Sequence, residues 1–269
     1  MAFFAEILNN QISVIVMTAI LAGALLGLLG IFVVLKNMAF FSDGLAHTAL
    51  AGLAIGTVLN QQPIWWALGC SLVFAVIIFW LEKKTSLLPD AIIGILFTAA
   101  LAFGVILLHF KSGGNPEDLE GLLFGDLQKI ALNDLYLTLV LAIICGSFIL
   151  LNFKKYIFLS LNKELAFLSG IKTELYQFLL YLVLAVTIIL GIKLLGVILV
   201  SALVIIPVST AKLFAPSARG LLWLTLLVSE AAIVIGLYLA YLTALPAGAV
   251  IVLSATLIFF VCLPFSLLR

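Results

Sequence analysis

Long runs of apolar residues, each close to the length of a bilayer crossing, follow one another along almost the whole chain. A membrane-spanning helix needs about 20 such residues, because lipid offers no hydrogen-bond partner to a non-helical backbone. Of the 269 residues, 65% are hydrophobic and 9% are charged, against about 25% charged in a soluble domain. The alternation of a membrane β-strand is absent, since residues 198–208 are apolar on every face. The sequence therefore predicts an all-α polytopic membrane protein.

Polar residues, prolines and glycines divide the apolar runs into nine candidate helices. Their expected ranges are 11–35, 44–60, 64–81, 90–109, 130–152, 174–192, 194–214, 221–243 and 247–266. The sixth and seventh ranges almost touch, so a bundle of eight transmembrane helices is the alternative to nine. We expect one transmembrane permease domain over residues 1–269.

The basic residues predict the orientation. With the N-terminus outside, ten of the thirteen lysines and arginines face the cytoplasm, and only Lys111, Lys129 and Lys193 face outward. Cytoplasmic loops carry this excess of basic residues. The sequence thus predicts a plasma (inner) membrane protein with its C-terminus inside. The first apolar stretch, residues 12–35, is longer than a cleavable signal and no basic residue precedes it, so we expect it to be retained.

Ionisable residues inside the predicted spans are rare, and the leading pair is Asp43 and His47. A spacing of four places both on one helix face, one turn apart. A carboxylate and an imidazole so placed can each supply one ligand to a divalent transition metal. The alternative is a hydrogen bond between them that braces the start of the helix.

Next to this pair runs a stripe of small residues at intervals of four: Gly44, Thr48, Gly52 and Gly56. Such a stripe lets another helix approach closely, so the polar pair is expected at a tight helix–helix seam. Pro207 is expected to kink the seventh candidate helix.

Two further ionisable residues are candidates for the same pathway. Glu230 lies about ten residues into the eighth range. It is either a ligand or relay group, or a neutral carboxylic acid hydrogen-bonded to a Ser or Thr. His109 is the last residue of the fourth range. It is either a metal ligand or an imidazole that lies in the membrane interface.

The longest predicted inner connection contains a short amphipathic helix over residues 162–170. Asn162 is suited to cap its start, and Gly170 to follow its end. Leu165 and Phe167 have no evident role inside the membrane. The segment is either a docking element or a surface turn.

Enzyme motifs are absent from the sequence: it has no HExxH, GxSxG or Walker A loop. A proton-driven carrier would need more acids and arginines within its spans than this chain has. A chain that transports against a gradient then needs energy from a partner.

The segment from Leu35 to Leu50, LKNMAFFSDGLAHTAL, resembles the motif of permease subunits of zinc/manganese/iron-type ABC importers. The resemblance continues in family order through further segments, with Glu230 lacking a counterpart. They are residues 90–94, 123–126, Glu164-Leu165-Ala166 with Gly170, 196–212 around Pro207, and 246–248.

This resemblance implies a homodimeric permease with no permanent cofactor, and a divalent metal path through Asp43 and His47. It implies two cytoplasmic ATP-binding subunits docked on Asn162, Glu164, Leu165, Ala166, Phe167 and Gly170. It also implies an extracytoplasmic metal-binding protein that delivers the ion. The sequence around Asp43 is most similar to that of zinc permeases; manganese or iron specificity is the alternative. Rival interpretations are a proton-coupled metal transporter and a structural scaffold.

Overall fold

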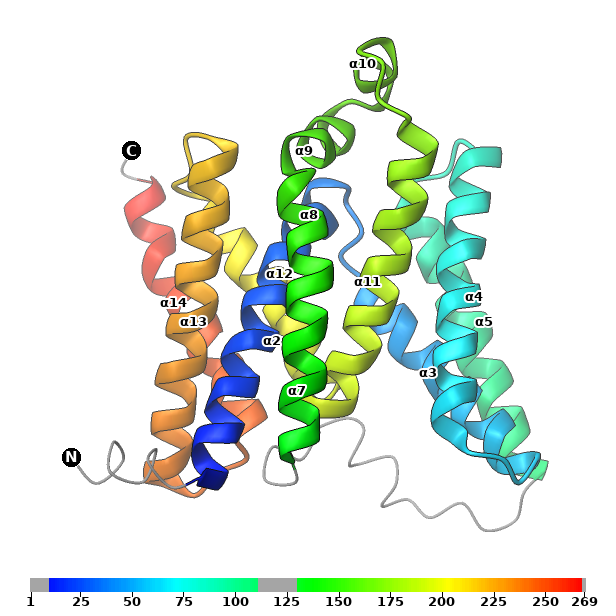
Figure 1. Cartoon of the computed structure of the whole chain (residues 1–269), viewed down its shortest axis with the longest axis horizontal. Coiled ribbons are helices and arrows are strands. Elements are labelled where there is room, and N and C mark those ends of the chain that lie inside the picture. The colour runs from blue at the N-terminus through cyan, green and yellow to red at the C-terminus, as the bar shows by residue number, and fades with distance from the viewer. Residues whose placement is uncertain (1–9, 111–129, 268–269) are drawn as a thin grey trace. The chain divides into compact units, whose positions relative to one another are not determined.

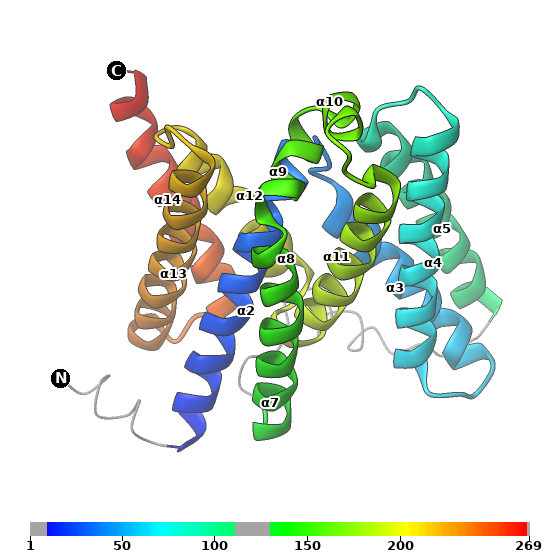
Figure 2. The ribbon, with the colours of Figure 1, turned by 45° about the horizontal axis from the view of Figure 1, so that its top comes forward.

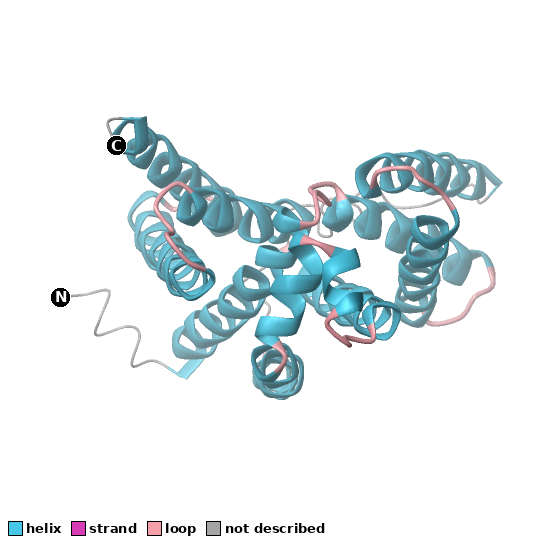
Figure 3. Ribbon diagram, turned by 90° about the horizontal axis from the view of Figure 1, so that it is seen from above, coloured by secondary structure: helices cyan, strands magenta, loops and turns pink. Residues whose placement is uncertain are grey.

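The computed structural model describes residues 10–110 and 130–267, apart from the side chains of Asn10, Val105 and residues 108–110. Within these ranges the chain consists of helices joined by turns and short loops (Figures 1 and 3). The helices are α2 (Asn10–Leu35), α3 (Phe41–Val58), α4 (Pro63–Lys84), α5 (Pro89–Phe110), α7 (Leu132–Leu141), the π-helical turn η2 (Ala142–Gly146), α8 (Ser147–Leu151), α9 (Phe153–Leu161), α10 (Lys163–Leu168), α11 (Thr173–Leu195), α12 (Val197–Lys212), α13 (Ala218–Thr243) and α14 (Ala247–Leu267).

Each of the nine expected ranges corresponds to a helix or, for 130–152, to the continuous series of α7, η2 and α8. Pro63 and Pro89 begin α4 and α5, where a missing amide proton costs no hydrogen bond. The sixth and seventh ranges are separate helices, because Gly196 adopts a φ of 82° between α11 and α12. That left-handed conformation suits glycine and ends a helix.

Six helices among the described residues are long and apolar enough to cross a membrane. They are Gln11–Leu35, Pro63–Lys84, Leu132–Leu151, Thr173–Leu195, Ala218–Thr243 and Ala247–Leu267. Apolar stretches also occupy Pro89–Gly104 and Val197–Lys212, which are shorter. The predicted all-helical, multi-pass architecture is therefore confirmed, and the count of eight or nine spans stays a prediction.

The chain divides into two compact units, each built from segments distant in sequence. Unit 1 comprises Met1–Val34, Gly121–Phe153 and Gly191–Arg269, and unit 2 comprises Leu35–Glu120 and Lys154–Leu190. In unit 1, α12, α13 and α14 pack on one another, and α13 and α14 lie side by side in Figures 1 and 2. In unit 2, α3 packs on α4 and α5. Unit 2 thus contains the helix that carries Asp43 and His47.

Pro207 lies within α12, and the helix continues through it from Val197 to Lys212. One turn later the Thr210 hydroxyl donates a hydrogen bond to the carbonyl oxygen of Ile206 at 2.8 Å.

Candidate functional site

Asp43 and His47 lie in the first two turns of α3, and both side chains are half-buried. The ring of His47 meets the ring of Phe97 in α5 edge to face, with centroids 4.7 Å apart. Its Nδ1 atom is buried and has no hydrogen-bond partner among the described residues. An imidazole nitrogen without a partner retains the capacity to accept a metal ion.

The small residues of α3 face its neighbouring helices at very short range. A Cβ on Gly44 would lie 2.7 Å from the Phe74 ring, and one on Gly52 would lie 2.5 Å from the carbonyl oxygen of Trp66. A Cβ on Gly56 would come within 2.7 Å of the backbone of Pro63, where α4 begins. Glycine is thus needed for α4 to pack this closely on α3.

Thr48 belongs to the same stripe, and its hydroxyl donates to the carbonyl oxygen of Gly44 at 2.8 Å within α3. Because this bond satisfies the hydroxyl locally, Thr48 makes no demand on the facing helix.

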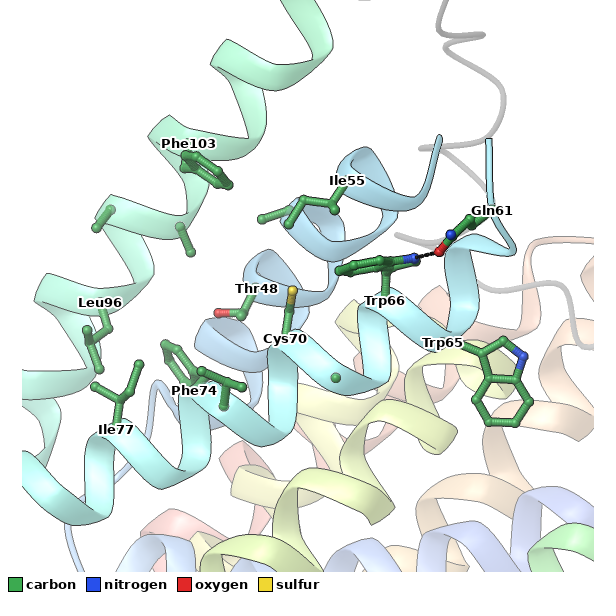
Figure 4. A pocket seen from close by; sticks show the side chains of 15 residues that line it. Thr48, Ile55, Gln61, Trp65, Trp66, Cys70, Phe74, Ile77, Leu96 and Phe103 are labelled. Atoms are coloured by element: carbon green, nitrogen blue, oxygen red, sulfur yellow. Dashed lines mark hydrogen bonds between the residues drawn. The ribbon is translucent and has the colours of Figure 1, made fainter. Parts of the chain in front are cut away.

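A cavity of about 920 Å³ lies between α3, α4 and α5, and Figure 4 shows its lining. The lining is apolar apart from the Thr48 hydroxyl, the Cys70 thiol and the Gln61 amide, whose Oε1 accepts from the Trp66 indole at 2.9 Å. Neither Asp43 nor His47 is among its lining residues. The cavity therefore does not contain the metal-capable pair.

Glu230 lies in α13 of unit 1, and both of its carboxylate oxygens are buried without a hydrogen-bond partner among the described residues. The adjacent Ser229 hydroxyl donates to the carbonyl oxygen of Gly23 in α2 at 3.0 Å. Among the described residues, therefore, no Ser or Thr forms the hydrogen bond to Glu230 that was one of its two expected alternatives. The side chain of His109 and residues 123–126 lie outside the described residues.

In the described part of the chain, no group of three or more His, Cys, Asp and Glu side chains is close enough to hold a metal ion. Asp43 and His47 share a helix face in unit 2, whereas Glu230 belongs to unit 1. Asp43 and His47 are therefore two candidate metal ligands on α3, with no third such side chain beside them among the described residues.

The short helix in the expected inner connection is α10. Asn162 caps its start, and Gly170 follows its end. The Asn162 side-chain oxygen accepts a hydrogen bond from the Leu165 amide at 2.9 Å. Gly170 adopts a φ of 80°, and its amide donates to the carbonyl oxygen of Phe167 at 2.9 Å.

The outer face of α10 is apolar and exposed. Leu165, Phe167 and Leu168 expose 51%, 66% and 78% of their surfaces, while Ala166 between them is fully buried. Glu164 and Phe167 border a hollow of about 430 Å³ beside the start of α11. Three large apolar side chains exposed on six residues of helix mark a surface suited to a protein partner.

Sequence reasoning missed a buried ionic cluster in unit 2. Lys36 Nζ lies 3.4 Å from Glu82 Oε1, and the two side chains are 8% and 14% exposed. The Tyr181 hydroxyl donates to the other oxygen of Glu82. Their separations along the chain, 46 and 99 residues, leave no local pattern. The one available signal was Glu82 itself, an acid beside Lys83 and Lys84 at a span's end.

The chain matches the model of the ABC 3 transport family over residues 9–266. It is 32% identical over 253 residues to the "High-affinity zinc uptake system membrane protein ZnuB" of Haemophilus influenzae, covering 93% of this chain and 97% of that protein. It is 30% identical over 249 residues to the "Manganese transport system membrane protein MntC" of Listeria monocytogenes, covering 93% and 88%. Among solved structures it resembles "PsaBC from Streptococcus pneumoniae in complex with Fab", with a TM-score of 0.81 and 27% identity over 97% of this chain and 94% of that one.

Proposed function

The chain belongs to the ABC 3 transport family, and on that premise we propose that it is the permease subunit of an importer that moves a divalent transition-metal ion into the cytoplasm. The observation that carries the proposal is the pair of Asp43 and His47, one turn apart on α3, with a buried imidazole nitrogen that no described residue hydrogen-bonds. The carboxylate would offset the ion's loss of water, and the imidazole would supply a nitrogen ligand.

Two protein ligands suit a site that must release its ion. Zinc takes four ligands in a stable structural site, so a pair on one helix would bind it weakly and pass it on. We propose that a second copy of the chain completes the path as a homodimer. Glu230 and His109 are proposed as further ligands of the same ion.

Zinc is the proposed ion, with manganese or iron as the alternative. The sequence from Met38 to His47 supports zinc, because it resembles the corresponding motif of zinc permeases. The named relatives divide between zinc and manganese at 32% and 30% identity. Oxygen and nitrogen ligands suit both ions.

Energy for import would come from two cytoplasmic ATP-binding subunits docked on residues 162–170, with Leu165 and Phe167 as the apolar anchors. An extracytoplasmic metal-binding protein would deliver the ion. The chain would then lie in the plasma (inner) membrane with its N-terminus outside, as the bias in basic residues supports.

Reconstituted uptake tests the proposal most directly. The purified permease with its ATP-binding subunit is placed in liposomes, and uptake of zinc, manganese and ferrous ions is measured with and without ATP. We expect ATP-dependent uptake with zinc preferred, and Asp43→Asn to abolish it, because the amide keeps a hydrogen-bonding oxygen but loses the charge. Parental uptake by Asp43→Asn would remove the pair from the path.

Docking on α10 has its own test. Replacing Leu165 and Phe167 by Ser should sharply reduce co-purification of the ATP-binding subunit, because a short docking surface depends on a few apolar anchors. The matched control is Leu161→Ser in α9, where an equally exposed leucine (67%) lies outside α10. If the Leu165 and Phe167 variant co-purifies as much ATP-binding subunit as Leu161→Ser does, α10 is a surface turn and not a docking element.

A further inference from the structure

The cluster of Lys36, Glu82 and Tyr181 joins three segments of unit 2: the turn before α3, the end of α4 and the middle of α11. Besides the ion pair and the hydroxyl bond to Glu82, Lys36 Nζ lies 5.5 Å from the centre of the Tyr181 ring. Burial lowers the pKa of Lys36, and the adjacent Glu82 raises it. A buried ion pair is weak evidence for stability, and in some proteins such a pair serves to fix one specific arrangement.

The cluster is continuous with the start of the helix that carries Asp43. Phe41, the first residue of α3, stacks on the Tyr181 ring with centroids 5.8 Å apart. The Phe40 amide, directly before α3, donates to Asp90 Oδ1 in the first turn of α5 at 3.5 Å. The first turn of α3 is therefore held by α5 and α11, and through Lys36 by α4.

The cluster is also continuous with α10. Beside Glu82, Lys83 pairs with Glu174 in the first turn of α11 at 2.7 Å, and α10 joins α11 through four residues. The positive charge of Lys163 on α10 is close enough to lower the pKa of Lys36. Figure 1 shows α10, the end of α4 and the start of α11 at the same end of unit 2.

We propose that Lys36, Glu82 and Tyr181 are positioning residues that transmit displacement of α10 to the start of α3, and so to the Asp43–His47 pair. The proposal rests on the proposed function, because it assigns α10 to a partner that moves it. When α10 shifts, α11 shifts with it, and Tyr181 carries the movement to Glu82 and Phe41. Directional bonds among buried groups have few alternative arrangements, so they transmit a displacement rather than absorb it.

Two variants weaken the interactions within the cluster while leaving a side chain of nearly the same shape in place. Tyr181→Phe removes only the hydroxyl, and Glu82→Gln keeps the shape but removes the charge opposite Lys36. Lys193→Gln is the matched control, because it removes an exposed ion pair with Asp134 in unit 1. In the reconstituted complex we expect both cluster variants to bind the ATP-binding subunit and hydrolyse ATP, while ions imported per ATP fall several-fold. Lys193→Gln should keep the parental ratio.

A distance measurement reports the coupling without any metal. Spin labels are attached to Lys172→Cys, beside α10, and Val58→Cys, at the end of α3, in a complex free of other cysteines; both positions are exposed. Addition of nucleotide should change the distance in the parent and leave it unchanged in Tyr181→Phe and Glu82→Gln. A parental distance change in both variants would overturn the proposal. A parent that shows the distance change but imports no metal would count against the proposed function alone.

Discussion

Each unit contains a seam where glycines let helices approach closely, and the two seams differ in their polar groups. The glycines are Gly23, Gly27 and Gly30 of α2 in unit 1, and Gly44, Gly52 and Gly56 of α3 in unit 2. A Cβ on Gly30 would overlap the carbonyl oxygen of Val204 in α12, and a Cβ on Gly52 would lie 2.5 Å from that of Trp66 in α4. By packing alone, the two seams are alike.

The polar groups beside the two seams differ in kind. In unit 1 the Ser229 hydroxyl crosses the seam and is satisfied by the Gly23 carbonyl oxygen, while the Thr225 hydroxyl beside Gly27 is buried without a hydrogen-bond partner among the described residues. In unit 2 the Nδ1 atom of His47 is buried beside the seam without a partner among the described residues. A satisfied polar group joins two helices, whereas an unsatisfied one costs stability and persists where a ligand uses it. Small-residue spacing thus indicates close packing, and the hydrogen bonds distinguish the Ser229 brace from the His47 imidazole, whose free nitrogen could bind a metal ion.

The largest expected effect comes from His47→Leu. Uptake should fall to the background of liposomes without permease, while thermal stability in detergent stays at or above that of the parent, because an unpaired buried polar atom costs about 1–3 kcal/mol. Uptake and unfolding are measured on the same preparations. A loss of stability with a proportional loss of uptake would make His47 a brace like Ser229 and remove the contrast.

An intermediate effect is expected where the seams are alike. Gly30→Ala and Gly52→Ala should each lower the free energy of unfolding by about 1–3 kcal/mol, because the added methyl meets backbone that cannot rotate away. Gly94→Ala in α5 is the matched control: nothing lies within 4 Å of its added Cβ, and alanine favours a helix interior by about 0.5–1 kcal/mol. Thermal unfolding followed by tryptophan fluorescence measures all three. Equal stability among them would show that neither seam is tight.

The smallest effect is expected from the brace itself. Ser229→Ala should cost about 0.6 kcal/mol, the typical value for a hydrogen bond between membrane helices, with uptake retained. Thr48→Val is the comparison, because its hydroxyl bonds within its own helix and should cost less. If Thr48→Val is the more damaging of the two, hydroxyl bonding across the seam is not what stabilises unit 1.

Local patterns predicted the helices well. Proline begins α4 and α5, and a glycine with positive φ separates α11 from α12. Such boundaries depend on a residue's own backbone preferences, so they can be read without tertiary information. The cap of α10 is equally local, since Asn162 and the Leu165 amide are three residues apart.

The candidate site was only partly predictable. The spacing of Asp43 and His47 places them on one face of α3, but it does not indicate that Phe97 packs on the imidazole ring. The glycine stripe of α3 was recognised, whereas the four-residue spacing of Gly23 and Gly27 carries the same signal and was missed. Whether a polar atom beside a stripe finds a hydrogen-bond partner depends on the facing helix.

The amino-acid sequence alone determined the class of protein, the approximate helix ranges and the pair on α3, because hydropathy, backbone preference and helical periodicity act over a few turns. Only the tertiary structure decided that Lys36, Glu82 and Tyr181 meet, and that Ser229 bonds to Gly23. These contacts join residues 46 to 206 positions apart. They exist because helix packing brings distant side chains out of lipid and water together, where each buried polar group must find its partner in space.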